Sequence, residues 1–349
     1  MAGNLFFLSS GLFMGWSLGA NDAANIFGTA VATRMVRFRT AAVTAGLFII
    51  LGAVMGGAGV SQTYGELGAV NALAGAFTVS LAAALTVLGA TRSGLSVSTS
   101  QAIVGGIVGW NFFSSTPTDW STLYRILGTW VSAPLLGAVF AMALYFPIRY
   151  FLNHSRIHLL RLDKYTRFAL LCAGAFGAYS LGMNNIANVM GVFLHTAPFQ
   201  DLTLRGGVVL TAVQQLFLLG GAAIALGVLT YSRKIMMTVG GEIYTLSPVT
   251  AFIVVLASSL VLFVFGSQGL QAWLVALGLP PIPLVPVSQS QAVVGAIMGI
   301  GLARGGRNIN FRLLGRMALG WMATPAASAL LAYLGLFFMQ NVFMQPVFF

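Results

Sequence analysis

Charged side chains are scarce in this chain of 349 residues: only 7% of residues are charged, and only six are acidic. A soluble domain carries about 25% charged residues. Hydrophobic residues make up 58% of the chain, and the mean hydropathy is +0.90. This composition excludes a soluble globular protein and predicts an integral membrane protein. The 42 glycines are typical of membrane helices that pack closely or break.

Cysteine and histidine are almost as scarce. The single Cys172 excludes a disulfide within the chain and a cysteine metal cage, and the three histidines are too scattered to suggest a metal site. The chain contains no Ser-His-Asp, HExxH, P-loop or GxGxxG arrangement. We therefore expect no enzyme activity, no resident metal and no cofactor.

Long apolar runs, in contrast, fill the chain. A membrane crossing needs roughly 20 apolar residues, and ten segments approach or exceed that length: 5–33, 40–60, 68–90, 94–112, 122–148, 167–195, 206–231, 247–266, 286–303 and 313–338. If each segment crosses once, fifteen of the seventeen Lys and Arg residues fall on the side of the basic loop 149–167. Cytoplasmic loops carry such an excess. We therefore predict that this loop is cytoplasmic and that both termini lie outside. The net charge of +11 then reports orientation in a cell membrane and does not indicate nucleic acid binding.

Two motifs occur twice, in the same order in each half of the chain. GANDAANIFG (Gly19–Gly28) in the first segment returns as GMNNIANVMG (Gly182–Gly191) in the sixth. STSQAIVGGIVG (Ser98–Gly109) in the fourth segment returns as SQSQAVVGAIMG (Ser288–Gly299) in the ninth. Each half makes five crossings, an odd number, so the two halves are predicted to be inverted relative to each other. Inverted repeats with glycine-broken helices are typical of secondary transporters.

The predicted fold is an all-α polytopic membrane protein with two inverted-topology repeats and about 10–12 transmembrane segments. Residues 1–150 form the first repeat, 151–166 a basic cytoplasmic linker, and 167–349 the second repeat. We expect the first helix of each repeat to be broken at its Gly-Asn motif. The segments 94–112 and 286–303 either cross fully or are re-entrant hairpins. The proline-rich stretch 270–288 is assigned to an outer loop.

Asp22 is the only acidic residue in the middle of an apolar segment. A carboxylate at membrane depth is costly, and by default it marks a functional site. With Asn21 and Asn25 beside it, Asp22 provides the oxygen ligands that a hard cation prefers, so we predict a sodium or proton site. The second copy of this motif keeps three amides but no acid: Asn184, Asn185 and Asn188. These amides either extend the cation site or join helices by hydrogen bonds, and their register with the first motif favours the cation site.

Hydroxyl and amide side chains lie near the beginning of the fourth and ninth segments. They are Ser98, Thr99, Ser100 and Gln101 in the first half, and Ser288, Gln289, Ser290 and Gln291 in the second. The N-terminus of a helix offers free N–H groups and a positive dipole end, which suit an anion. Such residues also serve simply as helix N-caps. Two copies in inverted halves favour anion binding. Glu242, in GGEIYTLSP, is a weaker candidate for an inner vestibule.

These motifs are similar to those of the inorganic phosphate transporter family. The family's G-A-N-D-V-A-N-A-type motif is matched by Gly19–Asn25 and more loosely by Gly182–Asn188. Its P-V-S-T-T-H-type motif is matched by Ser96–Gln101 and Pro286–Gln291. The resemblance covers nearly the whole chain. It implies a cation-coupled symporter that binds phosphate under the paired hairpins, sodium at the Asp and Asn positions, and a second copy of the chain in a homodimer.

The sequence departs from the family pattern at three places: Asn185 replaces the second Asp, Gln101 and Gln291 replace the histidines, and Gln289 and Ser290 replace threonines. Phosphate carries a proton at neutral pH and can use an acceptor such as a carboxylate, whereas sulfate wants donors only. These changes favour sulfate, while the family as a whole favours phosphate. Phosphate symport is therefore our leading hypothesis, with a sulfate permease as the close alternative. A passive anion channel is less favoured, and a non-transporting scaffold lacks a soluble domain through which to signal.

Overall fold

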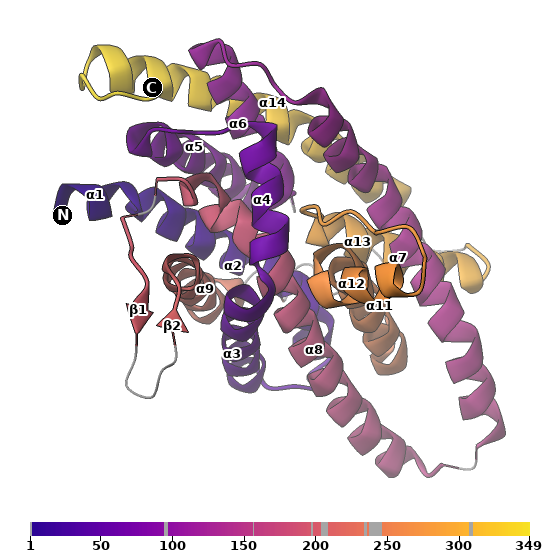
Figure 1. Cartoon of the computed structure of the whole chain (residues 1–349). Coiled ribbons are helices and arrows are strands. Elements are labelled where there is room, and N and C mark those ends of the chain that lie inside the picture. The colour runs from indigo at the N-terminus through magenta and orange to yellow at the C-terminus, as the bar shows by residue number, and fades with distance from the viewer. Residues whose placement is uncertain are drawn as a thin grey trace.

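The structure is a computed structural model that describes residues 2–93, 97–155, 157–196, 198–203, 209–233, 236, 246–306 and 310–349. It is mostly helical (Figure 1). In the first half of the chain lie α1 (Ala2–Phe7), α2 (Ser9–Ala32), α3 (Phe38–Gly56), α4 (Ala58–Leu67), α5 (Leu73–Arg92), α6 (Thr99–Ser114) and α7 (Trp120–His154). In the second half lie α8 (Leu159–Met190), the 3-10 turn η1 (Gly191–Phe193), the short strands β1 (Leu202–Thr203) and β2 (Val209–Leu210), α9 (Ala212–Thr230), α11 (Pro248–Gly266), α12 (Gln268–Ala276), α13 (Gln289–Ala303) and α14 (Phe311–Asn341).

Each of the ten predicted apolar segments contains a helix. Among the described residues, six helices are long and apolar enough to cross a membrane: α3, α5, α7, α9, α11 and α14. The helices α2 and α8 have the length but carry the polar motifs in their apolar stretches. The protein is therefore a multi-pass membrane protein, as its composition predicts.

The two halves exchange partners in a matched pattern. Helix α3 packs against α8, and α2 packs against α9. Helix α6 packs against α14, and α13 packs against α7. Each of these contacts joins a helix of one half to a helix of the other. The contact of α3 with α8 corresponds to that of α9 with α2, and the contact of α6 with α14 corresponds to that of α13 with α7. The polar starts of α6 and α13 lie inside this interlocked bundle.

Close helix crossings at glycine make this exchange possible. A Cβ atom at Gly52 on α3 would meet the carbonyl oxygen of Tyr179 on α8, and one at Gly182 on α8 would meet the carbonyl oxygen of Ile49 on α3. Small residues let membrane helices approach to backbone contact in this way. The small-residue runs of the sequence are therefore packing faces.

We predict that Gly182→Val lowers the stability of the protein, because the side chain has to push α8 away from α3. Overpacking of this kind costs about 1–3 kcal/mol or more. Thermal unfolding in detergent measures the loss, and Gly52→Val should behave alike. The control is Gly89→Val, because nothing lies within 4 Å of a Cβ atom at this position of α5. Equal unfolding temperatures for Gly182→Val and Gly89→Val would contradict this account of the crossing.

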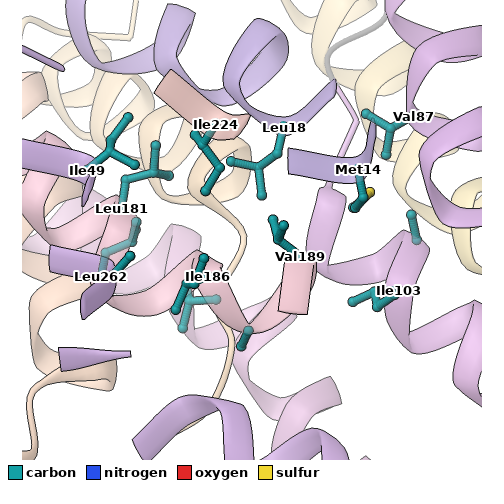
Figure 2. Close-up of a cluster of buried hydrophobic side chains, with 14 of the residues drawn as sticks. Met14, Leu18, Ile49, Val87, Ile103, Leu181, Ile186, Val189, Ile224 and Leu262 are labelled. Atoms are coloured by element: carbon teal, nitrogen blue, oxygen red, sulfur yellow. The ribbon is translucent and has the colours of Figure 1, made fainter. Parts of the chain in front are cut away.

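An apolar core surrounds the polar N-terminal ends of α6 and α13. Met14 and Leu18 of α2 point toward side chains from α8 and α9, including Val189 and Ile224, in the cluster shown in Figure 2. Ile103, one turn into α6, belongs to the same cluster. The polar residues described below are therefore enclosed by hydrocarbon, where an unpaired polar group is expensive.

The expectation of a broken first helix is wrong. Helix α2 is continuous through Gly19–Gly28, and α8 is continuous to Met190 before the 3-10 turn. The physical reason is that Asn21 finds a carbonyl partner at Val97, just before α6, and Asp22 finds a hydroxyl partner at Thr99, the first residue of α6, so neither needs to open its own helix. The interrupted elements are instead α6 and α13, which begin in the interior after extended residues such as Ser98 and Ser288.

Two connecting segments also differ from the prediction. The basic stretch 149–167 is largely helical, because α7 continues to His154 and α8 begins at Leu159, away from the centre of the bundle (Figure 1). The stretch 270–288 is not entirely loop, because α12 extends to Ala276 with Ser267 as its N-cap. Helix α4 is a further helix that the apolar pattern did not predict. Glu242 lies outside the described residues.

Candidate functional site

The starts of α6 and α13 are buried and built alike. Ser98 caps α6 by accepting the backbone N–H of Gln101 at 3.2 Å, and Ser288 caps α13 by accepting that of Gln291 at 3.4 Å. All four residues are at most 3% exposed. The N-terminal ends of two helices, with their free N–H groups and positive dipole ends, thus lie inside the protein.

The two starts are tied to each other by hydrogen bonds. The Ser100 hydroxyl donates to the carbonyl oxygen of Val287 at 3.2 Å, and the Ser290 hydroxyl donates to that of Val97 at 3.0 Å. Each start therefore holds the extended residue that precedes the other. The N-terminal ends of α6 and α13 consequently form one site, as the repetition of their sequences predicts.

Asp22 reaches this site from the middle of α2 and is 1% exposed. Its Oδ2 accepts the Thr99 hydroxyl at 2.9 Å, and its Oδ1 accepts the Asn21 amide at 3.1 Å. The same amide donates to the carbonyl oxygen of Val97 at 3.0 Å. Among the described residues, no basic side chain pairs with Asp22. The carboxyl group is thus held by neutral donors and has no basic partner among these residues.

Helix α8 approaches from the other half. The Asn184 amide donates to the carbonyl oxygen of Val285 at 3.1 Å, and its Oδ1 accepts the backbone N–H of Val287 at 2.8 Å. Asn184 thus holds the segment before α13 as Asn21 holds the one before α6. These two asparagines position the site.

Asn188 on α8 connects the start of α6 to helix α4. Its amide donates to the hydroxyl oxygens of Thr99 at 3.2 Å and Ser100 at 3.0 Å, and its Oδ1 accepts the Tyr64 hydroxyl at 2.6 Å. Thr99 in turn donates to Asp22. A chain of hydrogen bonds therefore runs from α4 through α8 and the start of α6 to the carboxylate on α2.

Tyr64 is a site residue that sequence reasoning missed. It lies on α4, is 1% exposed, and contributes its hydroxyl from outside both copies of the two repeated motifs. The polar run around it, SQTYGE, is the one signal in the sequence, but it resembles an ordinary loop.

Several predicted site residues have buried side-chain atoms with no hydrogen-bond partner in the part of the chain that the structure describes. The unpartnered atoms are Asn25 Nδ2, Asn185 Oδ1 and Nδ2, and the Oε1 atoms of Gln101, Gln289 and Gln291. Leaving a buried polar group unsatisfied costs about 1–3 kcal/mol, and such groups call for an explanation such as a ligand or an ion. All fourteen predicted site residues are buried, and the unpartnered atoms supply the donors and acceptors that a polar ligand needs.

Two buried helix N-termini and a buried carboxyl group inside a multi-pass membrane bundle are typical of a membrane transporter, and comparisons with known proteins support this class. Residues 18–332 match the model of the phosphate transporter family. The chain belongs to this family, whose members are transporters and not enzymes.

Several relatives extend over nearly the whole chain. A protein of Pyrococcus abyssi with a provisional phosphate-permease name is 25% identical, over 94% of this chain and 96% of its own length. The sulfate permease CysP of Bacillus subtilis is 29% identical, over 93% of this chain and 84% of its own length. A solved structure of a sodium-dependent phosphate transporter matches with a TM-score of 0.77 at 24% identity, covering 98% of this chain and all of that chain. The last likeness concerns the fold.

Proposed function

We propose that this protein is a secondary active symporter that carries inorganic phosphate, driven by a sodium or proton gradient. The observation that carries the proposal is the Thr99 hydroxyl. It stands at the start of α6, where an anion is favoured, and donates to Asp22, where a cation is favoured. The family model and the phosphate-permease relative support phosphate as the substrate.

In this mechanism the cation binds Asp22 with oxygen ligands from its neighbours, which include Asn21, Asn25 and Asn188 of α8. The anion binds between the starts of α6 and α13, where backbone N–H groups, serine hydroxyls and glutamine amides converge. A cation beside the anion lowers the electrostatic cost of both. Each ion therefore favours binding of the other, and loaded transporter changes access by rocking one repeat against the other.

Uptake of labelled phosphate into proteoliposomes tests the proposal. We expect accumulation above the external concentration when a sodium or proton gradient points inward, and none when both gradients are absent. Simple equilibration that ignores both gradients would indicate a passive anion channel. An excess of unlabelled sulfate should leave phosphate uptake unchanged.

Sulfate is the second candidate substrate, and a specific observation favours it. Asp22 already accepts a hydrogen bond on each of its oxygens, whereas a phosphate that carries a proton needs a further charged acceptor and sulfate needs none. The 29% identity to a sulfate permease points the same way. Sulfate uptake that phosphate does not compete with would establish this alternative.

We extend the proposal to topology and assembly. The matched exchange of partners between the halves supports an inverted repeat, with residues 1–150 and 167–349 as its two units and both termini outside. The 149–167 segment, with its five basic residues, is then cytoplasmic. The family resemblance supports a homodimer.

Tyr64→Phe is predicted to weaken anion binding. The change removes the donor to Asn188 and leaves a buried amide oxygen unsatisfied, at a cost of about 1–3 kcal/mol. The apparent Michaelis constant for phosphate should rise about tenfold, with the cation requirement kept. Tyr333→Phe, on the exposed face of α14, is the matched control. A Michaelis constant for Tyr64→Phe equal to that of wild type would show that this hydroxyl does not support the site.

A further inference from the structure

The two halves of the site can be aligned through their repeated sequences, and equivalent asparagines contact equivalent segments. Asn21 donates to the carbonyl of Val97, and Asn184 accepts the N–H group of Val287 and donates to the carbonyl of Val285. Asn21 and Asn184 are 163 positions apart in the sequence, and Val97 and Val287 are 190 positions apart. The next residue on each helix is Asp22 in one half and Asn185 in the other.

The same alignment makes Thr99 equivalent to Gln289, because each is the first residue of its helix after a serine N-cap. In the first half, Thr99 donates to Asp22 and both carboxylate oxygens have partners. In the second half, Asn185 has no partner for either side-chain atom among the described residues, and Gln289 has none for its Oε1. Asn185 is 0% exposed and Gln289 is 2% exposed. The two halves therefore place equivalent residues alike, but they differ in two ways. Only the first half carries an acidic side chain at this position, and only there are the side-chain oxygens hydrogen-bonded.

The charge difference changes what each half can bind. A cation that enters a dry site loses its hydration, and a nearby carboxylate compensates for that loss far better than a neutral amide oxygen does. Asp22 supplies such a charge. Asn185 is neutral, and its NH2 group can donate a hydrogen bond to an oxygen of a bound oxyanion.

We propose that the coupling cation binds only in the Asp22 half, and that the neutral Asn185 half contacts the oxyanion and carries no cation. Each anion is then cotransported with a single coupling cation. This inference rests on the proposed function and deepens it, because it assigns different tasks to two positions that the repeat makes equivalent. Asn185 becomes the residue that sets the number of coupling ions.

Paired flux measurements in proteoliposomes test this inference. The ratio of cation to labelled phosphate taken up is measured with labelled sodium, or with an internal pH indicator if protons drive uptake; labelled sulfate replaces phosphate if only sulfate is carried. We expect a ratio of about one for the wild type. Asn185→Asp restores a carboxylate at the equivalent position, so its ratio should rise about twofold.

Asn111→Asp is the matched control. Asn111 is also a buried asparagine with an unpartnered Oδ1, but it lies near the far end of α6. Its acidic variant should keep a ratio of about one.

The outcomes separate this inference from the function on which it rests. A wild type without gradient-driven uptake would refute the symporter itself. Coupled uptake with two or more cations per anion in the wild type would overturn the single-cation inference and leave the symporter standing. A ratio for Asn185→Asp that stays at one would overturn the equivalence of Asp22 and Asn185. If Asn185→Asp does not fold, the wild-type ratio alone decides.

Discussion

Asp22→Asn is expected to abolish accumulation of the anion against its gradient. The substitution keeps the shape of the side chain and an oxygen that can accept the Thr99 hydroxyl, but it removes the one charge at the proposed cation site. Coupling free energies between two ligands commonly reach 1–3 kcal/mol, or about 5- to 150-fold in affinity. We therefore expect the stimulation of phosphate uptake by the driving cation to fall by about 5- to 150-fold in this variant, measured in proteoliposomes.

Passive exchange distinguishes lost coupling from lost folding. The Asp22→Asn protein should still exchange labelled phosphate across the membrane at equal concentrations, because the starts of α6 and α13 are unchanged. Asp119→Asn, at the exposed N-cap of α7, is the control and should transport as the wild type does. Cation-stimulated accumulation that survives Asp22→Asn would remove Asp22 from the coupling mechanism.

Thr99→Val should have the second largest effect, because this hydroxyl serves two partners. It donates to Asp22 and accepts from Asn188, so the substitution breaks the chain of hydrogen bonds between the carboxylate and α8. A hydrogen bond to a charged group contributes about 1.5–3 kcal/mol. The apparent affinities for cation and anion should therefore both fall about 10- to 100-fold.

Two further variants make the Thr99→Val result specific. Thr99→Ser restores the hydroxyl and should recover most of both affinities. Thr78→Val removes a buried hydroxyl that donates to the carbonyl of Ala74 on α5 and should leave both affinities unchanged. If only the anion affinity of Thr99→Val fell, the hydroxyl would not connect the two ions.

Much of the candidate site could be predicted as a buried polar cluster, because its acid, hydroxyl and amide side chains are costly in a membrane environment. A lone acid at Asp22 and polar residues heading two small-residue helices are conspicuous in a chain with 7% charged residues. All of the predicted site residues are buried, and the hydrogen bonds between Ser100 and Val287 and between Ser290 and Val97 join the two predicted helix starts.

The rest depends on contacts that have no local signal. The Gly-Asn motif suggested an open helix, yet α2 remains regular because Val97 and Thr99, some 76 residues later, provide the partners. Tyr64 joins the site through one hydroxyl at a distance of 124 residues along the chain. The exchange of helix partners between the halves is likewise a property of packing across the whole bundle, which no local periodicity encodes.

The most direct test of the central claim is the affinity of the purified protein for labelled phosphate, measured at equilibrium with and without sodium and across pH in sodium-free buffer. The account predicts binding at least about fivefold tighter with one of these two cations, and no such difference in Asp22→Asn. A phosphate affinity that is independent of both cations in the wild type would contradict the coupling of the two sites through Thr99.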